Sequence, residues 1–231
     1  MPVETPAVEL AVAASALNAG LSDREDALAA TLTAITSLAL RMAPGAECAG
    51  LVLCRRGHPE PAGSPTPATE FDRLQIDLGE GPAVDMLRAA GSAVIEVTDL
   101  TGADARWPAF APAARERGVT ALLSIALVPR DRPLAALTLY ARDSALPGTA
   151  AAQLSAFAMP AAMALHAARR MAGLDQAVCS RDLIGQAKGV LMQRDGIGPD
   201  VAFDRLVAAS QHTNLKLLEV ARWLVEDAAR G

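Results

Sequence analysis

Cysteine and histidine, the residues that most often bind zinc and frequently act in catalysis, are few in this sequence. They are three cysteines and three histidines: Cys48, Cys54, Cys179, His58, His166 and His212. His58 follows Cys54 by four residues, but no second Cys/His pair supplies the remaining ligands of a tetrahedral zinc site. We therefore expect no metal site.

Cys48 and Cys54 are the candidates for thiol chemistry. They are six residues apart in an apolar run, and six residues of extended strand place them roughly 20 Å apart. At that distance they cannot form a disulfide with each other, and thiols buried in apolar surroundings are usually inert. Because neither a Ser/His/Asp set nor a recognisable pair of acids is present, we expect no enzymatic activity and no cofactor.

Length and composition describe a folded protein with room for one mid-sized domain and a small one. The chain has 231 residues, 52% of them hydrophobic, and a formal net charge of −5, which excludes global disorder. The first twenty residues carry Glu4 and Glu9 and no basic residue; because this is unlike a secretory signal, a cytoplasmic protein is expected. Residues 144–168 are uncharged but rich in alanine, which favours a packed helix over a membrane span.

Residues 21–146 predict a mixture of helices and strands, after a loosely ordered arm over 1–20. Apolar residues at helical spacing indicate one helix from Ser22 or Asp23 to Met42 and another over 107–117. Short apolar runs predict strands over 48–54, 93–97, 119–128 and 134–140, and a segment rich in Pro, Gly and Ser predicts a loop over 55–69. Since a short polar connection joins the last two strands, we expect an α+β fold, an antiparallel sheet with flanking helices.

After Pro147 the strand pattern ends, and residues 147–178 are expected to form a long connector helix. One of its faces carries apolar residues at spacings of three and four: Leu154, Phe157, Ala161, Ala164, Ala168 and Met171. Such a seam suits a partner helix, and we expect it to join two chains in a homodimer. Pro160 lies inside the seam and is expected to kink the helix or to mark a restart, because proline lacks a backbone donor.

Residues 179–231 contain three short amphipathic segments, which predict an all-α three-helix bundle. Their apolar stripes are Leu183, Ile184, Ala187, Val190 and Leu191, then Phe203, Leu206, Val207 and Ser210, then Leu217, Leu218, Ala221, Leu224 and Val225. Pro199 is expected in the first position of the second helix, and Thr213 or Asn214 is expected to cap the third. A bundle of this size buries too little surface to be stable alone, so it should lean on the preceding helix or on a second chain.

Several elements at fixed spacing in this C-terminal segment carry a resemblance to a known family. They are Ile184-Gly-Gln-Ala-Lys-Gly-Val-Leu-Met192, Ala202-Phe203, Leu206, Ala209-Ser-Gln-His-Thr-Asn214, Lys216-Leu217 and Val220-Ala221. Together they resemble the ANTAR domain over residues 180–226, which implies an RNA-binding transcription antiterminator. Upstream, Leu78-Gly-Glu-Gly-Pro82, Asp85, Asp99-Leu100, Arg106-Trp-Pro108 and Phe110 resemble the GAF domain that accompanies ANTAR in actinobacterial regulators.

The resemblance implies RNA contacts, whereas the charge of the segment does not predict them. From Cys179 onward, seven Lys and Arg residues are matched by seven Asp and Glu residues, and phosphate binding usually needs a basic surface. The candidate RNA-binding residues are Lys188, Arg181, Arg194, Gln211, Thr213, Asn214 and Lys216. Lys188 and Arg181 lie about 20° apart on one flank of the first helix, and Lys216 points away from the third apolar stripe.

Some of these residues have simpler interpretations. Arg194 lies in line with its apolar stripe, where it would interact favourably with the helix C-terminus. Asn214 could serve only as a helix cap. Trp223 lies about 160° from the centre of the third stripe, too far round to be core; it either stacks on an unpaired base or packs against another helix or a second copy.

GAF domains commonly sense small molecules, and the resemblance implies a pocket near the following residues: Leu78, Gly81, Pro82, Asp85, Asp99 and Trp107. The residues alone also allow a structural role. Gly79 and Gly81 could shape a turn before a helix that begins at Pro82, both aspartates could cap local backbone, and Trp107 could belong to the core. Family members often have cysteine after the Gly-Pro pair, whereas this chain has Ala83, which removes thiol chemistry there.

We therefore expect an RNA-binding transcription antitermination regulator with a GAF-like sensor over 21–146 and an ANTAR output over 179–231. The sensor would respond to an unknown small molecule, and the output would bind hairpins in an mRNA leader. Some GAF proteins reduce free methionine sulfoxide with cysteines, but the positions of Cys48 and Cys54 argue against this activity. The alternative is a ligand- or protein-binding signalling module whose C-terminal helices only mediate dimerisation.

Overall fold

The computed structural model describes residues 24–62, 66–89, 94–100, 106–142 and 146–230. The chain divides into two compact units, Met1–Arg170 and Met171–Gly231. The predicted arm over 1–20 and the predicted cap at Ser22 or Asp23 lie outside the described residues.

The first unit is built on a five-stranded antiparallel sheet with the strand order β2-β1-β5-β4-β3. The strands are β1 (Cys48–Arg55), β2 (His58–Pro61), β3 (Val94–Val97), β4 (Ala121–Leu127) and β5 (Ala135–Ala141). Four strands and the β4–β5 hairpin confirm the prediction, whereas β2 corrects the loop expected over 55–69. β2 contains two prolines, which are typical of loops and led to the loop prediction. They are tolerated in β2 because it is an edge strand.

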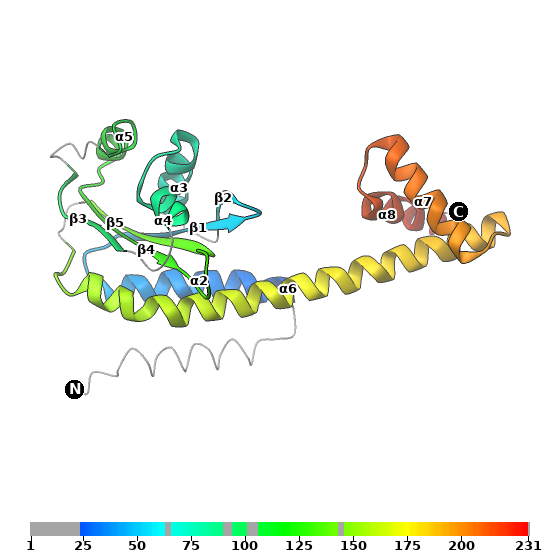
Figure 1. The fold of residues 1–231 in the computed structure, drawn as a ribbon, viewed down its shortest axis with the longest axis horizontal. Coiled ribbons are helices and arrows are strands. Elements are labelled where there is room, and N and C mark those ends of the chain that lie inside the picture. Colours follow the sequence, from blue (N-terminus) through cyan, green and yellow to red (C-terminus); the bar gives the residue numbers. More distant parts are fainter. Residues whose placement is uncertain (1–23, 63–65, 90–93, 101–105, 143–145, 231) are drawn as a thin grey trace. The chain divides into compact units, whose positions relative to one another are not determined.

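Helices cover both faces of this sheet (Figure 1), which confirms the predicted α+β architecture. On one face lie α2 (Arg24–Met42) and the first part of α6 (Ala150–Asp195), and on the other lie α3 (Thr66–Leu78), α4 (Pro82–Arg88) and α5 (Phe110–Glu116). In β1, Leu51 and Leu53 face α2 and α6, whereas Cys48 and Val52 face the other helices. Because both faces are covered, the strands appear in the sequence as continuous apolar runs.

Two helices of the first unit differ from expectation. α3 begins at Thr66, inside the segment expected to be a loop; Pro67 is compatible with a first helical turn as well as with a loop. The helix expected over 107–117 is the shorter α5, and the turn before it places Trp107 in the core at 1% exposure. The helix expected to begin at Pro82 is confirmed as α4.

The apolar seam expected to meet a partner helix is occupied within the chain. Leu154, Phe157 and Ala161 are at most 1% exposed and pack against α2 and the sheet. An apolar stripe predicts that one helix face is buried, but it does not predict which surface covers that face. α6 also continues through Pro160 without interruption, so the predicted restart is wrong. The homodimer itself stays a prediction.

The second unit is a three-helix bundle formed by the last part of α6 together with α7 (Pro199–Thr213) and α8 (Leu217–Ala228). Its buried core consists of Ala187, Leu191, Ala202, Leu206, Ala221 and Leu224. This core confirms the first and third predicted stripes, whereas the second is corrected, because Phe203 is 38% exposed and Ala202 is buried in its place. Pro199 begins α7 as predicted. The predicted cap of the third helix is wrong, because Asn214 ends α7 in the left-handed conformation (φ 55°) and Lys216 is the N-cap of α8.

Across the described ranges, no helix combines the length and the apolar character needed to cross a bilayer. The uncharged residues expected to form a packed helix do so, since Ala150, Leu154 and Leu165 of α6 belong to the core of the first unit.

Candidate functional site

The end of α7 and the turn that follows it contain four of the candidate RNA-binding residues. Gln211, Thr213, Asn214 and Lys216 are all exposed there. Thr213 Oγ1 donates a hydrogen bond to the carbonyl oxygen of Ala209 at 2.7 Å, and the backbone N–H of Lys216 donates to the Glu219 carboxylate at 3.0 Å. These local bonds fix the shape of the turn. The amide side chains and the Lys216 ammonium group remain accessible to a partner.

Lys188 and Arg181 lie on α6 instead. Arg181 is exposed, and Lys188 is half-buried with its Nζ 5.8 Å from the centre of the Phe203 ring on α7. An ammonium group over an aromatic face is attracted by about 0.5–1 kcal/mol at such exposed sites. Lys188 is therefore held against α7 rather than extended freely into water.

Arg194 closes the end of α6. Its Nε donates to Oδ1 of Asp195 at 2.9 Å, and Arg205 of α7 donates to the other carboxylate oxygen at 2.5 Å. The hydrogen bond from Arg194, with the charges of both arginines, lowers the pKa of Asp195. Arg194 thus joins α6 to α7 through a shared carboxylate, a structural role beside its candidate role in RNA binding.

The surface of α8 is hollowed near Trp223. This hollow of about 390 Å³, called the α8 hollow below, is lined by Gln176, Lys216, Leu218, Glu219, Arg222, Trp223 and Glu226. Trp223 is 65% exposed, which confirms that it lies outside the core. The hollow places the candidate residue Lys216 on the same side of α8 as the indole ring of Trp223, as expected for two helical positions seven residues apart.

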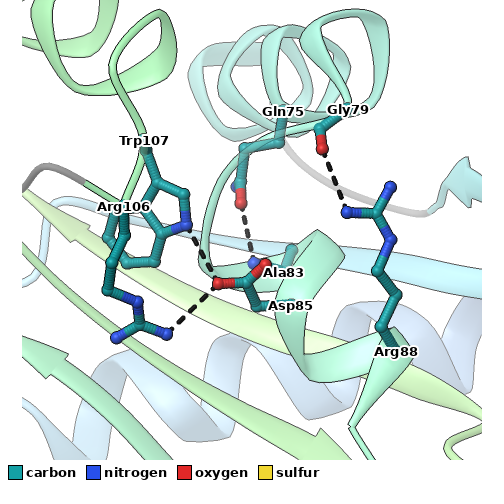
Figure 2. A network of polar contacts seen from close by, with 7 residues as sticks. All are labelled: Gln75, Gly79, Ala83, Asp85, Arg88, Arg106 and Trp107. Carbon is teal, nitrogen blue, oxygen red and sulfur yellow. Dashed lines mark hydrogen bonds and ion pairs between the residues drawn. The ribbon is translucent and has the colours of Figure 1, made fainter.

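In the first unit, the residues of the GAF-like motif bind one another (Figure 2). Asp85 of α4 accepts a hydrogen bond from Trp107 Nε1 at 3.0 Å. The same carboxylate forms an ion pair with the Arg106 guanidinium at 3.2 Å. The Arg106 guanidinium also lies 4.9 Å from the centre of the Trp107 ring. Asp85 therefore holds the turn before α5 against α4.

Glu80 makes a second link in this motif, one that sequence reasoning missed. Its carboxylate accepts hydrogen bonds from the backbone N–H groups of Ala109 and Phe110 at 2.8 and 3.1 Å. A negative charge at the first turn of a helix is stabilising, because the N-terminal N–H groups lack partners inside the helix. Glu80 thus caps α5 from the α3–α4 connection, across about thirty residues of chain.

Gly81 is required at its position for two reasons. Its φ of 119° is rarely adopted by L-residues, and a Cβ atom there would lie 2.5 Å from the Gln75 side chain. That approach allows Gln75 Oε1 to accept a hydrogen bond from the backbone N–H of Ala83 at 2.7 Å (Figure 2). The Gly-Pro pair therefore shapes a tight entry into α4, as the structural interpretation of the motif expected.

A buried polar chain connects α3, α4 and β5. The Tyr140 hydroxyl donates to Asp72 at 2.7 Å and accepts from Gln75 Nε2 at 2.6 Å. All three side chains are at most 1% exposed. Burial, followed by the nearby Asp72 carboxylate, raises the pKa of Tyr140 well above its ordinary value. None of these three residues was singled out from the sequence, since a buried polar residue on a helix has no periodicity of its own.

The candidate ligand-binding residues fall into two groups. Gly81, Pro82, Asp85 and Trp107 lie together around α4, at least partly buried. Leu78, at the end of α3, is 40% exposed, and Asp99 is exposed as well. In the described part of the chain, every buried side-chain polar atom has a hydrogen-bond partner. The motif therefore positions α4 and α5 by contacts within the chain.

The cysteines are free thiols. Cys48 is 6% exposed, and burial raises its pKa to about 11, so it is protonated at neutral pH and a poor nucleophile. Cys48 and Cys54 lie on the same strand, β1.

The chain thus combines an antiparallel sheet covered by helices on both faces with a helical bundle that follows it in sequence. The GAF domain model matches residues 25–166, and the ANTAR domain model matches residues 172–225. The chain therefore belongs to the GAF domain family and carries an ANTAR domain, an antitermination output domain, after its GAF domain. This combination is that of a signal-transducing regulator. No curated protein matches the chain.

Solved structures resemble part of this chain. The GAF domain of a phosphoenolpyruvate-protein phosphotransferase from Coxiella burnetii is 16% identical with a TM-score of 0.50, covering 73% of this chain and 96% of that one. A GAF domain/HD domain protein from Geobacter sulfurreducens is 15% identical (TM-score 0.45; 62% and 94% covered). A type II free methionine-R-sulfoxide reductase from Thermoplasma acidophilum is 14% identical (TM-score 0.46; 62% and 96% covered). At such identities the likeness concerns the fold alone.

Proposed function

We propose that this protein is an RNA-binding transcription antitermination regulator. Its GAF domain would sense a signal, and its ANTAR domain would bind hairpins in a nascent mRNA leader, so that a competing terminator does not form. The observation that carries this proposal is the ANTAR match over 172–225, which coincides with the three helices packed around Ala187, Leu206 and Ala221. The proposed role is non-enzymatic, and the protein would perform it in the cytoplasm, where the nascent transcripts are.

The distribution of charge supports RNA binding in spite of the neutral total. Asp195 is shared by Arg194 and Arg205, so these two cations partly neutralise a single acid. Within the described ranges Arg181, Lys216 and Arg222 form no ion pair, and all three are exposed. Unpaired exposed cations can take phosphate groups without first breaking an internal salt bridge.

Removing either lysine should weaken hairpin binding. In gel-shift titrations of the full chain with hairpin RNA at several salt concentrations, Lys188→Ala and Lys216→Ala should each lower the salt slope by about one. The reason is that binding releases about one counterion fewer from the RNA for each phosphate contact that is lost. Arg130→Ala, an exposed cation beyond β4 in the first unit, is the matched control and should change neither affinity nor slope.

The outcomes separate the two candidate functions. Wild-type protein that fails to bind hairpin RNA at low salt would favour the signalling module whose C-terminal helices only mediate dimerisation. Equal affinities for the wild type and the Lys188→Ala/Lys216→Ala double variant would reject these two residues as contacts.

We also propose that the regulator acts as a homodimer through the exposed face of α6. Met159 and Met163 are 56% and 52% exposed on this helix, roughly opposite the stripe of Leu154 and Phe157 that covers the chain's own core. An apolar helix face of this kind is stabilised when a second helix covers it. Two copies would present two ANTAR domains to paired hairpins.

A charge on this face should prevent association. Met163→Glu is expected to sediment as a monomer at micromolar concentration where the wild type is a dimer, because pairing would bury two carboxylates. Val201→Glu, which adds the same charge at an exposed apolar position of α7, is the control and should sediment as the wild type does. A monomeric wild type, or a dimeric Met163→Glu variant, would contradict the proposed face.

A small molecule bound by the GAF domain is the signal that we propose. Such a ligand can shift the activity of the output only by as much as its affinities for the two states differ. The Asp85–Trp107 contact and the Glu80 cap join α4 to α5, so a ligand near α4 would act on both helices.

A further inference from the structure

The α8 hollow combines an exposed indole ring with charged side chains in an arrangement that the family match does not explain. Trp223 is one of two tryptophans in the chain; Trp107 is 1% exposed, whereas Trp223 is 65% exposed. The apolar stripe of α8 packs through Ala221 and Leu224, so α8 does not need Trp223 for its own folding. An exposed tryptophan offers a large flat apolar face with a polar edge, which suits it to binding a partner.

The lining of the hollow argues against a protein helix as its occupant. Lys216, Glu219, Arg222 and Glu226 surround Trp223, with Gln176 of α6 nearby. The buried centres of protein interfaces are depleted in lysine and glutamate, and burying such charges under an apolar helix is costly. The indole ring, the two carboxylates and the two cations of the lining instead suit a partner with a flat apolar face, hydrogen-bond donors at its edges and an attached negative charge.

A nucleotide has these three properties. We propose that the α8 hollow holds one unpaired nucleobase of the RNA, stacked on Trp223 with its phosphate on Lys216 and Arg222; this inference rests on the proposed RNA-binding function. Aromatic side chains stack on splayed bases in this way, and Lys and Arg contact the phosphates.

The acids of the hollow define which bases it prefers. Glu219 already accepts a hydrogen bond from the backbone N–H of Lys216. Glu226 also lines the hollow, and it makes no hydrogen bond or ion pair to any side chain in the described ranges. A carboxylate accepts hydrogen bonds from exocyclic amino groups. The hollow therefore favours adenine, cytosine or guanine over uracil.

The test uses full-length protein and hairpin RNAs that carry 2-aminopurine at single loop positions. At one position, 2-aminopurine fluorescence should be quenched on binding, and Trp223→Ala should abolish the quenching. The same variant should weaken hairpin affinity by about 5- to 150-fold, the range for loss of one stacked base. Its salt slope should equal that of the wild type, because no charge is removed, whereas Trp223→Phe should retain part of the affinity.

Val201→Ala is the matched control, because Val201 is an exposed apolar residue of α7 (49%) that does not line the hollow; it should bind as the wild type does. Replacing the quenched base by uracil should weaken wild-type binding and have less effect on Glu226→Ala. Trp223→Ala and Val201→Ala both replace exposed side chains, so both variants should keep the circular dichroism spectrum of the wild type.

Each other outcome overturns the inference in a recognisable way. Trp223→Ala protein that binds the hairpin as tightly as the wild type refutes base stacking and leaves the proposed RNA-binding function intact. Loss of dimers in Trp223→Ala with unchanged hairpin affinity shows that a second copy covers the hollow. Wild-type protein that binds no hairpin refutes the proposed function itself.

Discussion

Replacing Gly81 by alanine should destabilise the first unit by about 3 kcal/mol, the sum of a strained backbone and an overpacked contact. The φ of 119° at Gly81 is unfavourable for any L-residue, and the new Cβ would lie 2.5 Å from Gln75 Oε1 and 2.6 Å from its Cγ. Moving Gln75 away would also break its bonds to Ala83 and Tyr140. The substitution thus disturbs α3, α4 and β5 together.

Gly79 supplies the matched control two residues earlier. It also has a positive φ, 64°, but the atom nearest to its added Cβ is the Arg88 side chain at 4.0 Å. Gly79→Ala should cost only about 1 kcal/mol, the penalty for the left-handed conformation. Denaturant unfolding followed through Trp107, in a Trp223→Phe background, measures both changes. Equal losses for the two variants would show that the Gln75 contact does not matter.

Replacing Tyr140 by phenylalanine should cost about 2–4 kcal/mol, because the variant removes one partner from each of two buried polar groups. Asp72 loses the hydroxyl donor at 2.7 Å, and Gln75 loses the acceptor at 2.6 Å. Thr138→Val, which removes one hydroxyl from the buried Ser124–Thr138 pair, is the control and should cost about 1 kcal/mol. A loss for Tyr140→Phe no larger than that of the control would contradict the account.

The same residue predicts how stability depends on pH. The pKa of Tyr140 is raised in the folded protein, so the unfolded chain loses the phenolic proton at lower pH than the folded chain does. The contribution of Tyr140 is therefore complete below its ordinary pKa of 10.0 and declines as the pH rises above it. Because Tyr140 is the single tyrosine, tyrosinate absorbance should appear together with unfolding. The Tyr140→Phe variant should lack this decline and keep only the one that Cys48 contributes above its ordinary pKa of 9.0.

The sheet was predictable because its strands are continuous apolar runs covered on both faces. The edge strand β2 was not, since the two prolines of His58–Pro61 are typical of loops. For α6, the sequence predicted which face is apolar but not which surface covers that face. In the structure, Leu154 and Phe157 pack against α2 and the sheet rather than against a second copy.

The site was predictable in its residue types and less so in its contacts. Spacing indicated a helix at Pro82 and a position outside the core for Trp223, and both are confirmed. It could not indicate that Glu80 caps a helix thirty residues later, or that Lys188 lies over the Phe203 ring. Such contacts depend on side chains brought together by tertiary structure, and no local pattern encodes them.

Sequencing the RNA that co-purifies with the full chain tests the proposed function most directly. The account predicts enrichment of leader transcripts in which paired hairpins overlap a terminator, with the enrichment lost in the Lys188→Ala/Lys216→Ala variant. Recovery of no RNA, or of the same bulk RNA with wild type and variant, would contradict it.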